Sequence, residues 1–273
     1  MHAGCRGLNA SFPAKWYENV TGGFAVCVPP KAGHTSWQFI KRDISQLGPI
    51  GGNTKILSIR HPLSRLAACY REKFLDGRSI REFSENDRSR EIWWRRYWFP
   101  ALISRGDIPE PSWVKTQYKS TVNQTDSCNR LAHVRTLIVT QSRDVNHTLL
   151  QIRFQNATFT FQDFLRHVLW TAAIGLMDYH WAPQVCLCNP CKIHYDYILH
   201  LENIKQELRH VLHTLGISHE IAVPKAHAKK ADSQVSDAVY FENIPKEIME
   251  QIYSLHKYDF DVFSYSRSLA DMV

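Results

Sequence analysis

Two strand-like segments, each passing directly into a helical pattern, constrain the fold of this chain more than any other feature. Residues 23–30, GFAVCVPP, form a short apolar run that stops at two prolines, and a helical pattern follows over 35–43. The pattern recurs as a strand over 55–59 and a helix over 62–74, whose proline suits a first helical turn. This alternation predicts an α/β fold with a central parallel sheet flanked on both faces by helices.

The remainder of the chain carries weaker signals. Residues 76–130 are irregular in pattern and highly charged, whereas 137–140 is a candidate third strand. The segments 161–170 and 197–215 are helical in pattern. No internal repeat, low-complexity tract or long linker interrupts the sequence, and 44% apolar residues are enough for a sizeable core. We therefore expect a single domain over residues 20–270.

The loop that joins the first strand to the first helix, KAGHTSW over 31–37, has the composition of an anion site. A helix start presents unpaired backbone N–H groups, and the helix dipole adds to their attraction for an anion. Lys31 supplies a point charge, while Thr35 and Ser36 offer hydroxyl donors. The lysine precedes Thr35 by four residues, so this is not the nucleoside-triphosphate loop GxxxxGK[ST]. By itself the segment suits an ordinary capped loop with a solvated lysine equally well.

A second cation stands at the end of the second strand. Arg60 is placed where open α/β sheets bind their ligands, and a guanidinium there binds phosphate in a bidentate manner. We expect Arg65, Arg71 and Lys73 to be charges on the helix surface, with Glu72 as a local partner. Two phosphate-suited strand ends match the needs of a nucleotide that bears both a 5′ and a 3′ phosphate.

These motifs and several that follow resemble the Golgi carbohydrate sulfotransferases, especially the group acting on chondroitin, dermatan and terminal sugars of glycoproteins. The family pattern PKxxxTxW is similar to Pro30–Trp37, and RxPxxRLxSxYRxKF is similar to Arg60–Phe74. The downstream patterns HWxPQ, CxPC, YD, ET and YxxDxxxFxYS correspond, in that order, to residues 180–184, 188–191, 195–196, 201–202 and 258–266. The resemblance covers roughly residues 24–266.

The resemblance implies a P-loop-like sulfotransferase fold that depends on PAPS (3′-phosphoadenosine-5′-phosphosulfate). The implied activity is transfer of a sulfuryl group from PAPS to a hydroxyl of a glycan, either a glycosaminoglycan or a glycoprotein sugar. Lys31 would bind the 5′-phosphate and stabilise charge on the leaving oxygen, and Arg60 would secure the 3′-phosphate. The full set expected around the donor is Lys31, Ala32, Gly33, His34, Thr35, Ser36, Trp37, Arg60 and Ser64. The donor needs no metal, so none is expected, and no nucleic-acid partner is expected either.

An acceptor hydroxyl needs a general base, for which a histidine near neutrality is suited. His180, in the HWxPQ segment, is the first candidate, with His34 and Glu202 as alternatives and a structural role for His180 equally open. One departure from the family pattern stands out. The serine that helps to hold the 3′-phosphate is Ala68 here, and Ser64 lies one helical turn earlier. We therefore expect weaker donor binding, and a non-catalytic glycan-binding relative is the alternative function; the lysine–hydroxyl spacing disfavours a nucleotide kinase.

Glycosylation sequons favour the secretory pathway, and the cysteines are compatible with disulfides there. Five N-x-[ST] sequons are present where roughly one or two are expected by chance. They begin at Asn9, Asn19, Asn123, Asn146 and Asn156. The cysteines at 186, 188 and 191 could ligate zinc, but without a second CxxC pair disulfides are favoured.

The resemblance implies a type II protein of the Golgi membrane with a lumenal catalytic domain. The longest apolar stretch, 168–177, is about half of what a bilayer requires. We therefore expect residues 1–19 to be the remnant of a stem and the membrane anchor to be missing from this sequence.

The aromatic and basic cluster WWRRYW at 93–98 has two interpretations. Its rings and guanidinium groups suit a sulfated or uronic-acid glycan. They suit a core whose arginines face water equally well. The formal charge of +7 favours anionic partners without choosing among nucleotides, glycans, nucleic acid and membranes.

Overall fold

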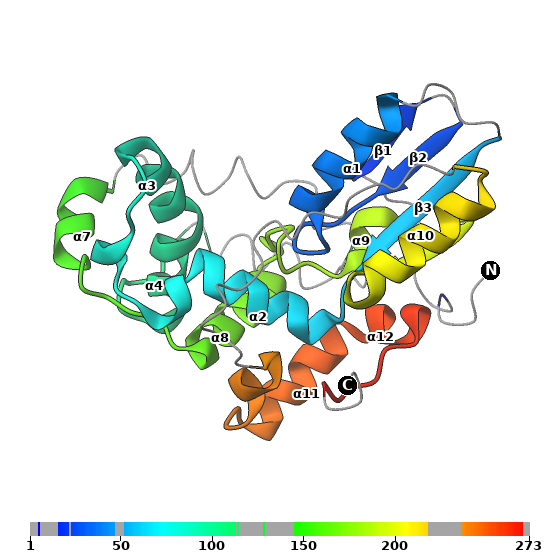
Figure 1. The fold of residues 1–273 in the computed structure, drawn as a ribbon. Coiled ribbons are helices and arrows are strands. Elements are labelled where there is room, and N and C mark those ends of the chain that lie inside the picture. Colours follow the sequence, from blue (N-terminus) through cyan, green and yellow to red (C-terminus); the bar gives the residue numbers. More distant parts are fainter. Residues whose placement is uncertain are drawn as a thin grey trace. The chain divides into compact units, whose positions relative to one another are not determined.

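A computed structural model gives the fold shown in Figure 1. It describes residues 5, 16–21, 23–46, 52–112, 114, 128, 145–217 and 236–269. Contacts between residues divide the chain into two compact units. The sheet unit comprises residues 1–65, 182–239 and 258–273, and the helical unit comprises residues 66–181 and 240–257.

The sheet unit is built on four strands in the order β1-β2-β3-β4. They are β1 (Tyr17–Thr21), β2 (Phe24–Cys27), β3 (Thr54–Ile59) and β4 (Tyr197–His200). The pairs β2/β3 and β3/β4 are parallel, as predicted, whereas β1 runs antiparallel to β2. The α/β class with a central sheet flanked by helices is confirmed, and the antiparallel edge strand makes the sheet mixed.

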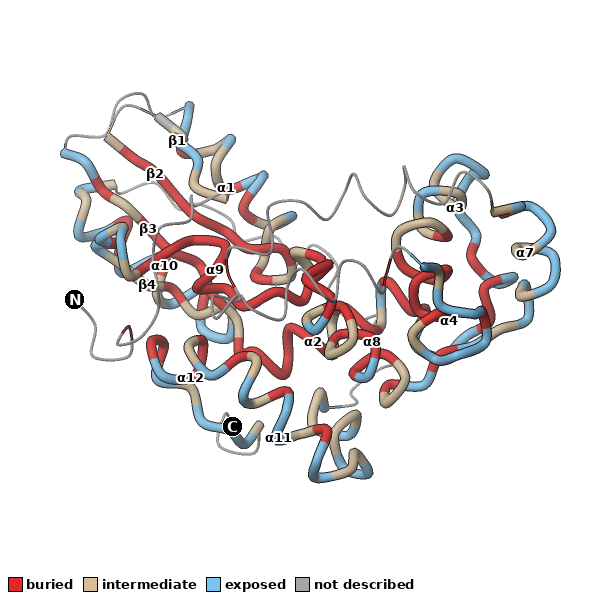
Figure 2. The backbone as a smooth tube through the Cα atoms, turned by 180° about the vertical axis from the view of Figure 1, so that it is seen from behind, coloured by how far each residue is buried: buried red, intermediate tan, exposed pale blue. Residues whose placement is uncertain are grey.

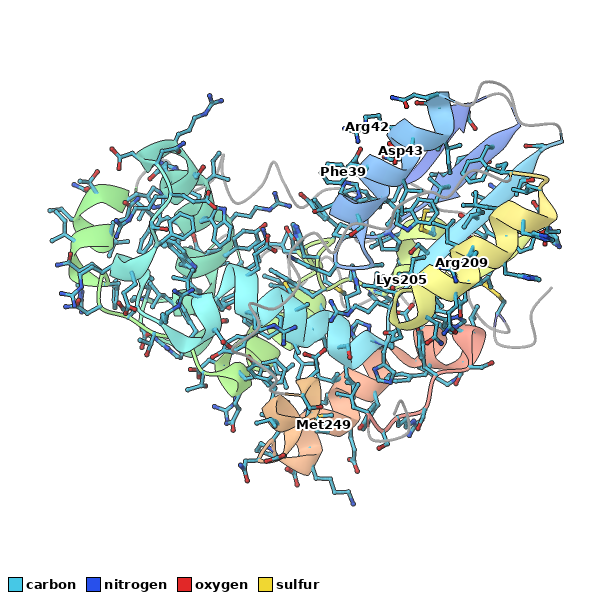
Figure 3. All side chains as sticks on the ribbon, viewed as in Figure 1. Phe39, Arg42, Asp43, Lys205, Arg209 and Met249 are labelled. Carbon is cyan, nitrogen blue, oxygen red and sulfur yellow. A yellow bond between two sulfur atoms is a disulfide. The ribbon has the colours of Figure 1, made fainter. Side chains whose placement is uncertain are left out.

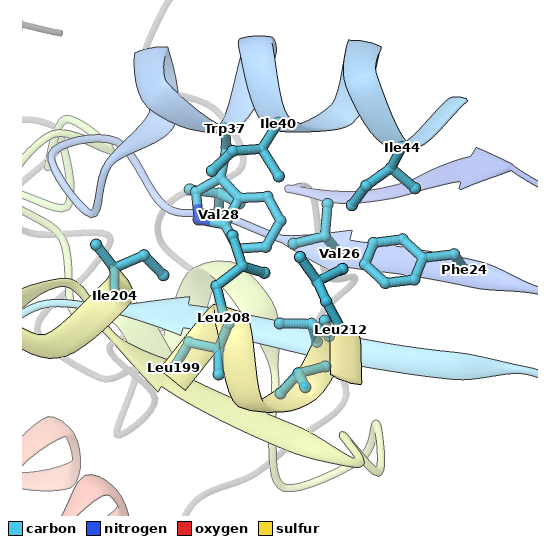
Figure 4. Close-up of a cluster of buried hydrophobic side chains, with 12 residues drawn as sticks. Phe24, Val26, Val28, Trp37, Ile40, Ile44, Leu199, Ile204, Leu208 and Leu212 are labelled. Atoms are coloured by element: carbon cyan, nitrogen blue, oxygen red, sulfur yellow. The ribbon is translucent and has the colours of Figure 1, made fainter. Parts of the chain in front are cut away.

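One face of the sheet is covered by α1 (His34–Gln46) and α10 (Ile204–Thr214). Both helices are amphipathic, with apolar residues spaced three or four apart toward the sheet. Figure 4 shows the resulting cluster, which is formed by Phe24, Val26, Val28, Trp37, Ile40, Ile44, Ile56, Leu199, Ile204, Leu208, Val211 and Leu212. The outer faces carry exposed side chains that include Phe39, Arg42, Lys205 and Arg209 (Figure 3).

The prediction of a helix over 197–215 is wrong in its first residues. Residues 197–200 form β4, a short 3₁₀ turn follows at Leu201–Asn203, and only then does α10 begin. Residues Tyr197 to His200 pair one by one with Ile56 to Ile59 of β3. The partner strand is about 140 positions away in the sequence, so tertiary pairing overrides the local helical pattern.

Disulfides are confirmed over the zinc alternative. Cys27 of β2 is bonded to Cys188 of α9 (Gln184–Cys188), and Cys5 is bonded to Cys191. Successive strand residues face opposite sides, so Cys27 points away from the cluster that holds its neighbours in β2 and ties α9 to the other face of the sheet. Six of the seven cysteines are oxidised, and the seventh, Cys69, is buried on α2 and forms no disulfide.

The described part of the helical unit holds helices and turns. The helix α2 begins in the sheet unit and continues into the helical unit, and α12 lies in the sheet unit apart from its first residue. The bounds are α2 (Pro62–Lys73), α3 (Asp87–Trp93), a π-helical turn (Trp94–Trp98), α4 (Phe99–Arg105), α7 (His147–Arg153), α8 (Phe161–Ala173), α11 (Lys246–Leu255) and α12 (Lys257–Phe263). Shorter 3₁₀ turns lie at Leu75–Gly77, Ile80–Glu82 and Asp237–Phe241.

The helix predicted over 161–170 is confirmed by α8, but the irregular segment predicted over 76–130 is wrong for residues 87–105. That stretch is continuously helical because Trp94, Tyr97 and Trp98 of the WWRRYW cluster are buried, each at 2% exposure or less. In Figure 2 the part of this stretch at α4 is largely red, whereas α3 is tan and pale blue. The cluster therefore supplies core residues. The candidate strand over 137–140 lies outside the described residues.

Three of the five sequons fall on described residues, and the asparagines at 19, 146 and 156 are all exposed. The sequons at 9 and 123 lie outside the described residues. Among the helices that the structure describes, none combines the length and apolar character needed to cross a bilayer.

Replacing both Cys27 and Cys188 by alanine is expected to lower the free energy of unfolding by about 2–5 kcal/mol, because this bond closes a long loop in the unfolded chain. Chemical denaturation of the purified protein measures the effect. Cys69→Ala is the control, since it removes a buried thiol that closes no loop. Equal losses in the two proteins would contradict the prediction.

Candidate active site

The loop between β2 and α1 is anchored through its carbonyl oxygens. Five successive residues each accept a hydrogen bond from the sheet unit. The donor–acceptor pairs are Ala32 N to Pro29 O at 3.0 Å, Arg65 Nε to Pro30 O at 2.8 Å, Arg60 Nη1 to Lys31 O at 3.4 Å, Ser58 Oγ to Ala32 O at 3.1 Å and Trp37 N to Gly33 O at 2.9 Å. The N–H of a trans peptide points opposite to its C=O. Fixing the carbonyls therefore fixes the direction of the amides, as an anion cradle at a helix start requires.

Two residues of this loop have left-handed backbone conformations. Lys31 has a φ of 69° and Gly33 a φ of 87°. A Cβ on Gly33 would lie 2.8 Å from Cδ1 of Leu201, so the turn uses both the freedom and the small size of glycine. Lys31 adopts the strained region despite its side chain, which a surrounding structure must enforce. The anchored carbonyls supply that constraint.

The remaining predicted donor-binding residues of the loop have different surroundings. Thr35 and Ser36 lie in the first turn of α1, where helical amides have no partner within the helix. Trp37 is 1% exposed and packs in the hydrophobic cluster, so its ring attaches α1 to the sheet. His34 is half-buried, with its Nε2 3.1 Å from Nε2 of Gln38, and burial lowers the pKa of His34.

Arg60 immediately follows the last residue of β3, as predicted. Its guanidinium lies 3.2 Å from the carboxylate of Asp237 and within 3.4 Å of the carbonyl oxygen of Lys31. The parallel pairing of β2 with β3 brings the two strand ends to the same edge of the sheet. The residues predicted to bind the 5′-phosphate and the residue predicted to bind the 3′-phosphate, Arg60, therefore lie side by side.

The prediction that Arg65 and Lys73 are surface charges is wrong. Arg65 is 1% exposed, and its guanidinium donates to the carbonyls of Pro30 and of Ala182, the latter at 2.6 Å. Lys73 is also buried, with its ammonium 4.4 Å from the ring centre of Trp93. Burial lowers the pKa of Lys73. Helical spacing cannot reveal such burial, because long cationic side chains reach partners far from their own helix.

His61, which directly follows Arg60, is fully buried. Its Nδ1 accepts from the Leu63 N–H at 3.2 Å, so Nε2 carries the proton and donates to the carbonyl of Ser266 at 2.9 Å. Burial lowers the pKa of His61. The carboxylate of Glu202 accepts from the His61 N–H at 2.8 Å and from the Tyr265 hydroxyl at 3.2 Å. These bonds give Glu202 a structural role and disfavour it as the base.

His180 lies in the helical unit and is oriented by Asp178, a residue that the sequence analysis missed. Oδ1 of Asp178 accepts from the His180 N–H at 2.9 Å and from its Nδ1 at 2.6 Å, while Oδ2 accepts from Arg96 Nε at 2.8 Å. With the proton on Nδ1, Nε2 is the acceptor nitrogen. Burial lowers the pKa of His180 to about 4, although Asp178 opposes that shift. The imidazole is therefore neutral near pH 7 and in the tautomer that a general base needs.

Ser64 is buried on the first turn of α2 in the sheet unit, together with Arg60 and the loop over 31–37. His180 belongs to the other unit. Among the residues that the structure describes, no group of three or more His, Cys, Asp or Glu side chains is arranged to hold a metal ion.

The sulfotransferase family matches the chain over residues 49–266, which is most of its length. The chain therefore belongs to the sulfotransferase family, and the family prediction is confirmed.

Curated relatives include carbohydrate sulfotransferase 11 of Danio rerio, 29% identical over 112 residues that make up 40% of this chain and 32% of the relative. Carbohydrate sulfotransferase 12 of Mus musculus is 27% identical over 129 residues, or 45% of this chain and 30% of the relative. Carbohydrate sulfotransferase 10 of Xenopus laevis is 31% identical over 114 residues, which make up 38% of this chain and 32% of the relative. The matched part spans about a third of the length of these relatives. No solved structure matches the chain.

His180 is expected to stay neutral until the pH falls to about 4, well below its ordinary value of 6.5. The unfolded chain binds this proton more readily. His180 therefore lowers the stability of the folded protein as the pH falls from about 6.5 to about 4. Asp178→Asn should lower the pKa of His180 further, because it removes the charge that favours the imidazolium. NMR titration of the histidine ring protons measures both values, with His180→Gln identifying the resonance. A midpoint near 6.5 would refute the assignment.

Proposed function

We propose that this protein is a carbohydrate sulfotransferase that transfers a sulfuryl group from PAPS to a hydroxyl of a glycan. The observation that carries the proposal is the anchored loop at Lys31, set beside Arg60 at the end of the neighbouring strand. Membership of the sulfotransferase family supports the reaction class. The names of the relatives, all carbohydrate sulfotransferases, support a glycan as acceptor.

The residues present suit the two phosphates of PAPS. The oriented amides of the loop, the Lys31 ammonium and the hydroxyls of Thr35 and Ser36 would hold the 5′-phosphate. Arg60 would bind the 3′-phosphate, and Ser64 on the first turn of α2, four positions further along the chain, would offer a hydroxyl. When bound, PAPS supplies the sulfuryl group and its leaving group. The chain contributes position and positive charge, on which phosphoryl-like transfers depend.

The acceptor hydroxyl loses a proton as it attacks, and we assign that proton to Nε2 of His180. Asp178 holds Nδ1–H and would stabilise the imidazolium that forms. Arg96 in turn holds Asp178 in its ionised form, and the pKa of that carboxyl is lowered well below its usual range by His180 and Arg96 against the effect of burial. The three side chains therefore form a preorganised base.

A lumenal location in the Golgi, with a type II membrane anchor, is part of the proposal. Disulfides persist in oxidising compartments, and two of them tie Cys5 and Cys27 to the segment around α9. The exposed sequon asparagines at 19, 146 and 156 suit the same secretory route.

The decisive experiment is a calorimetric titration of the glycosylated protein with PAP, the desulfated donor product, beside a Lys31→Ala, Arg60→Ala double variant. Saturable binding that the double variant loses is the expected result, because both phosphates lose their cation. A screen of glycosaminoglycan and glycoprotein acceptors with PAPS follows from it. A folded wild-type protein that binds no PAP at millimolar concentration would refute the enzyme and favour a glycan-binding relative, as Ala68 in place of the family's serine allows.

Gly33→Ala is expected to weaken PAP binding at least about ten-fold, because the added methyl group displaces the turn that carries the loop amides. Gly216→Ala is the matched control. Gly216 also has a positive φ, 73°, but nothing lies within 4 Å of an added Cβ and the residue lies after α10. Both variants should lose about 1 kcal/mol of stability from backbone strain. Unchanged PAP affinity in Gly33→Ala would contradict the cradle.

A further inference from the structure

We propose that Gln184 and Asp259 are positioning residues for Arg60 and thereby determine how strongly the protein recognises a 3′-phosphate. The inference rests on the proposed function, because it concerns the same nucleotide site. Neither residue is a ligand of the nucleotide in this proposal. Gln184 acts on Arg60 through a direct pair of hydrogen bonds, and Asp259 acts on Arg60 by holding Gln184.

Gln184 binds both polar groups of the Arg60 backbone with its side-chain amide. The Arg60 N–H donates to Oε1 of Gln184 at 2.9 Å, and Nε2 of Gln184 donates to the Arg60 carbonyl at 2.7 Å. Pairing between β3 and β4 ends one residue earlier, at Ile59 and His200. The side-chain amide of Gln184 gives Arg60 the donor and acceptor that a neighbouring strand would offer. Arg60 is held as a strand residue although it lies beyond the strand.

Asp259 of α12 fixes Gln184 in turn. It is fully buried, and its two carboxylate oxygens accept from the backbone N–H groups of Gln184 at 2.8 Å and of Val185 at 2.9 Å. These amides belong to the first turn of α9, where no helical partner exists for them. The other end of α9 is tied to β2 by the disulfide between Cys188 and Cys27. Gln184 is thus mounted on a short helix that is held at both ends.

This arrangement matters for Arg60 because its side chain is long and rotates about several bonds. A guanidinium recognises a phosphate only in a defined direction, so the placement of the backbone decides whether both N–H groups reach the ligand. Asp237 and the Lys31 carbonyl lie beside the guanidinium, but they do not fix the backbone of Arg60. Gln184 holds the backbone of Arg60 through its two hydrogen bonds.

The test compares two ligands that differ only in the 3′-phosphate, PAP and adenosine 5′-phosphate (AMP). Gln184→Met keeps the length of the side chain but forms neither hydrogen bond. It is expected to lower the affinity for PAP about ten-fold and to leave the affinity for AMP within about two-fold. A general structural defect would weaken both ligands alike, so the ratio of the two affinities is the readout.

Two further variants sharpen the test. Tyr195→Phe is the matched control, because the buried Tyr195 hydroxyl donates to the Cys188 carbonyl at 2.6 Å on the same helix without contacting Arg60. It should leave the ratio unchanged. Asp259→Asn, a substitution of equal size at the far end of the relay, should lower the ratio as Gln184→Met does. It provides a second reading if the methionine variant does not fold.

In the background of Arg60→Ala, the Gln184→Met substitution should cause no further loss of PAP affinity, since the two residues act as one unit. Additive losses, or a PAP to AMP ratio that Gln184→Met and Asp259→Asn leave unchanged, would overturn the inference while the proposed function stands. A wild-type protein that binds neither nucleotide would overturn both, and the two failures are therefore distinct.

Discussion

The hydrogen bonds of the buried Arg65 guanidinium are the interaction on which the loop after β2, the proposed nucleotide site, depends. The guanidinium bonds the carbonyl of Pro30 in the loop after β2 and the carbonyl of Ala182 in the segment before α9. A buried cation is costly unless its N–H groups are satisfied, so these carbonyls cannot move away without a penalty. Arg65 thereby holds in register two segments about 150 residues apart, and the left-handed turn at Lys31 and Gly33 forms against that fixed point.

Three histidines of similar intrinsic chemistry receive different roles from their surroundings. His61 is neutral, bonded through both ring nitrogens, and serves as a structural link near the start of α2. His180 is held through one nitrogen by Asp178, which leaves the other as a proton acceptor. His34 lies at the start of α1 and is half-buried beside Gln38. The partner of each ring nitrogen, more than the residue type, distinguishes the proposed base from the structural histidine.

Several motif residues shared with the family pattern bind other parts of the protein. Gln184 and Asp259 hold the backbone around Arg60, while Glu202 accepts from the His61 N–H and the Tyr265 hydroxyl. The sequence order of the motifs hides this convergence, since they come from β3, α9, α12 and the segment after β4. The family pattern therefore includes residues that hold the site in place as well as residues suited to its chemistry.

The sequence by itself determined the local elements and the residue types of the site. The apolar runs of β2 and β3, the helices that follow them and the positions of Lys31 and Arg60 at strand ends all follow from periodicity and from proline and glycine placement. Disulfides, too, followed from cysteine spacing, although their pairing did not.

Only the tertiary structure decided which charges are buried and which partners they have. The burial of Arg65 and Lys73, the orientation of His180 by Asp178 and the conversion of residues 197–200 into a strand were not predicted. The physical reason is that the partners of these side chains lie far away in the sequence. Arg60 and Gln184 are 124 positions apart and His61 and Ser266 are 205 apart, so the hydrogen bonds that place these side chains exist only once the chain has folded. Local patterns report the faces of helices and strands, whereas the environment of a buried polar group is set by segments that meet in space.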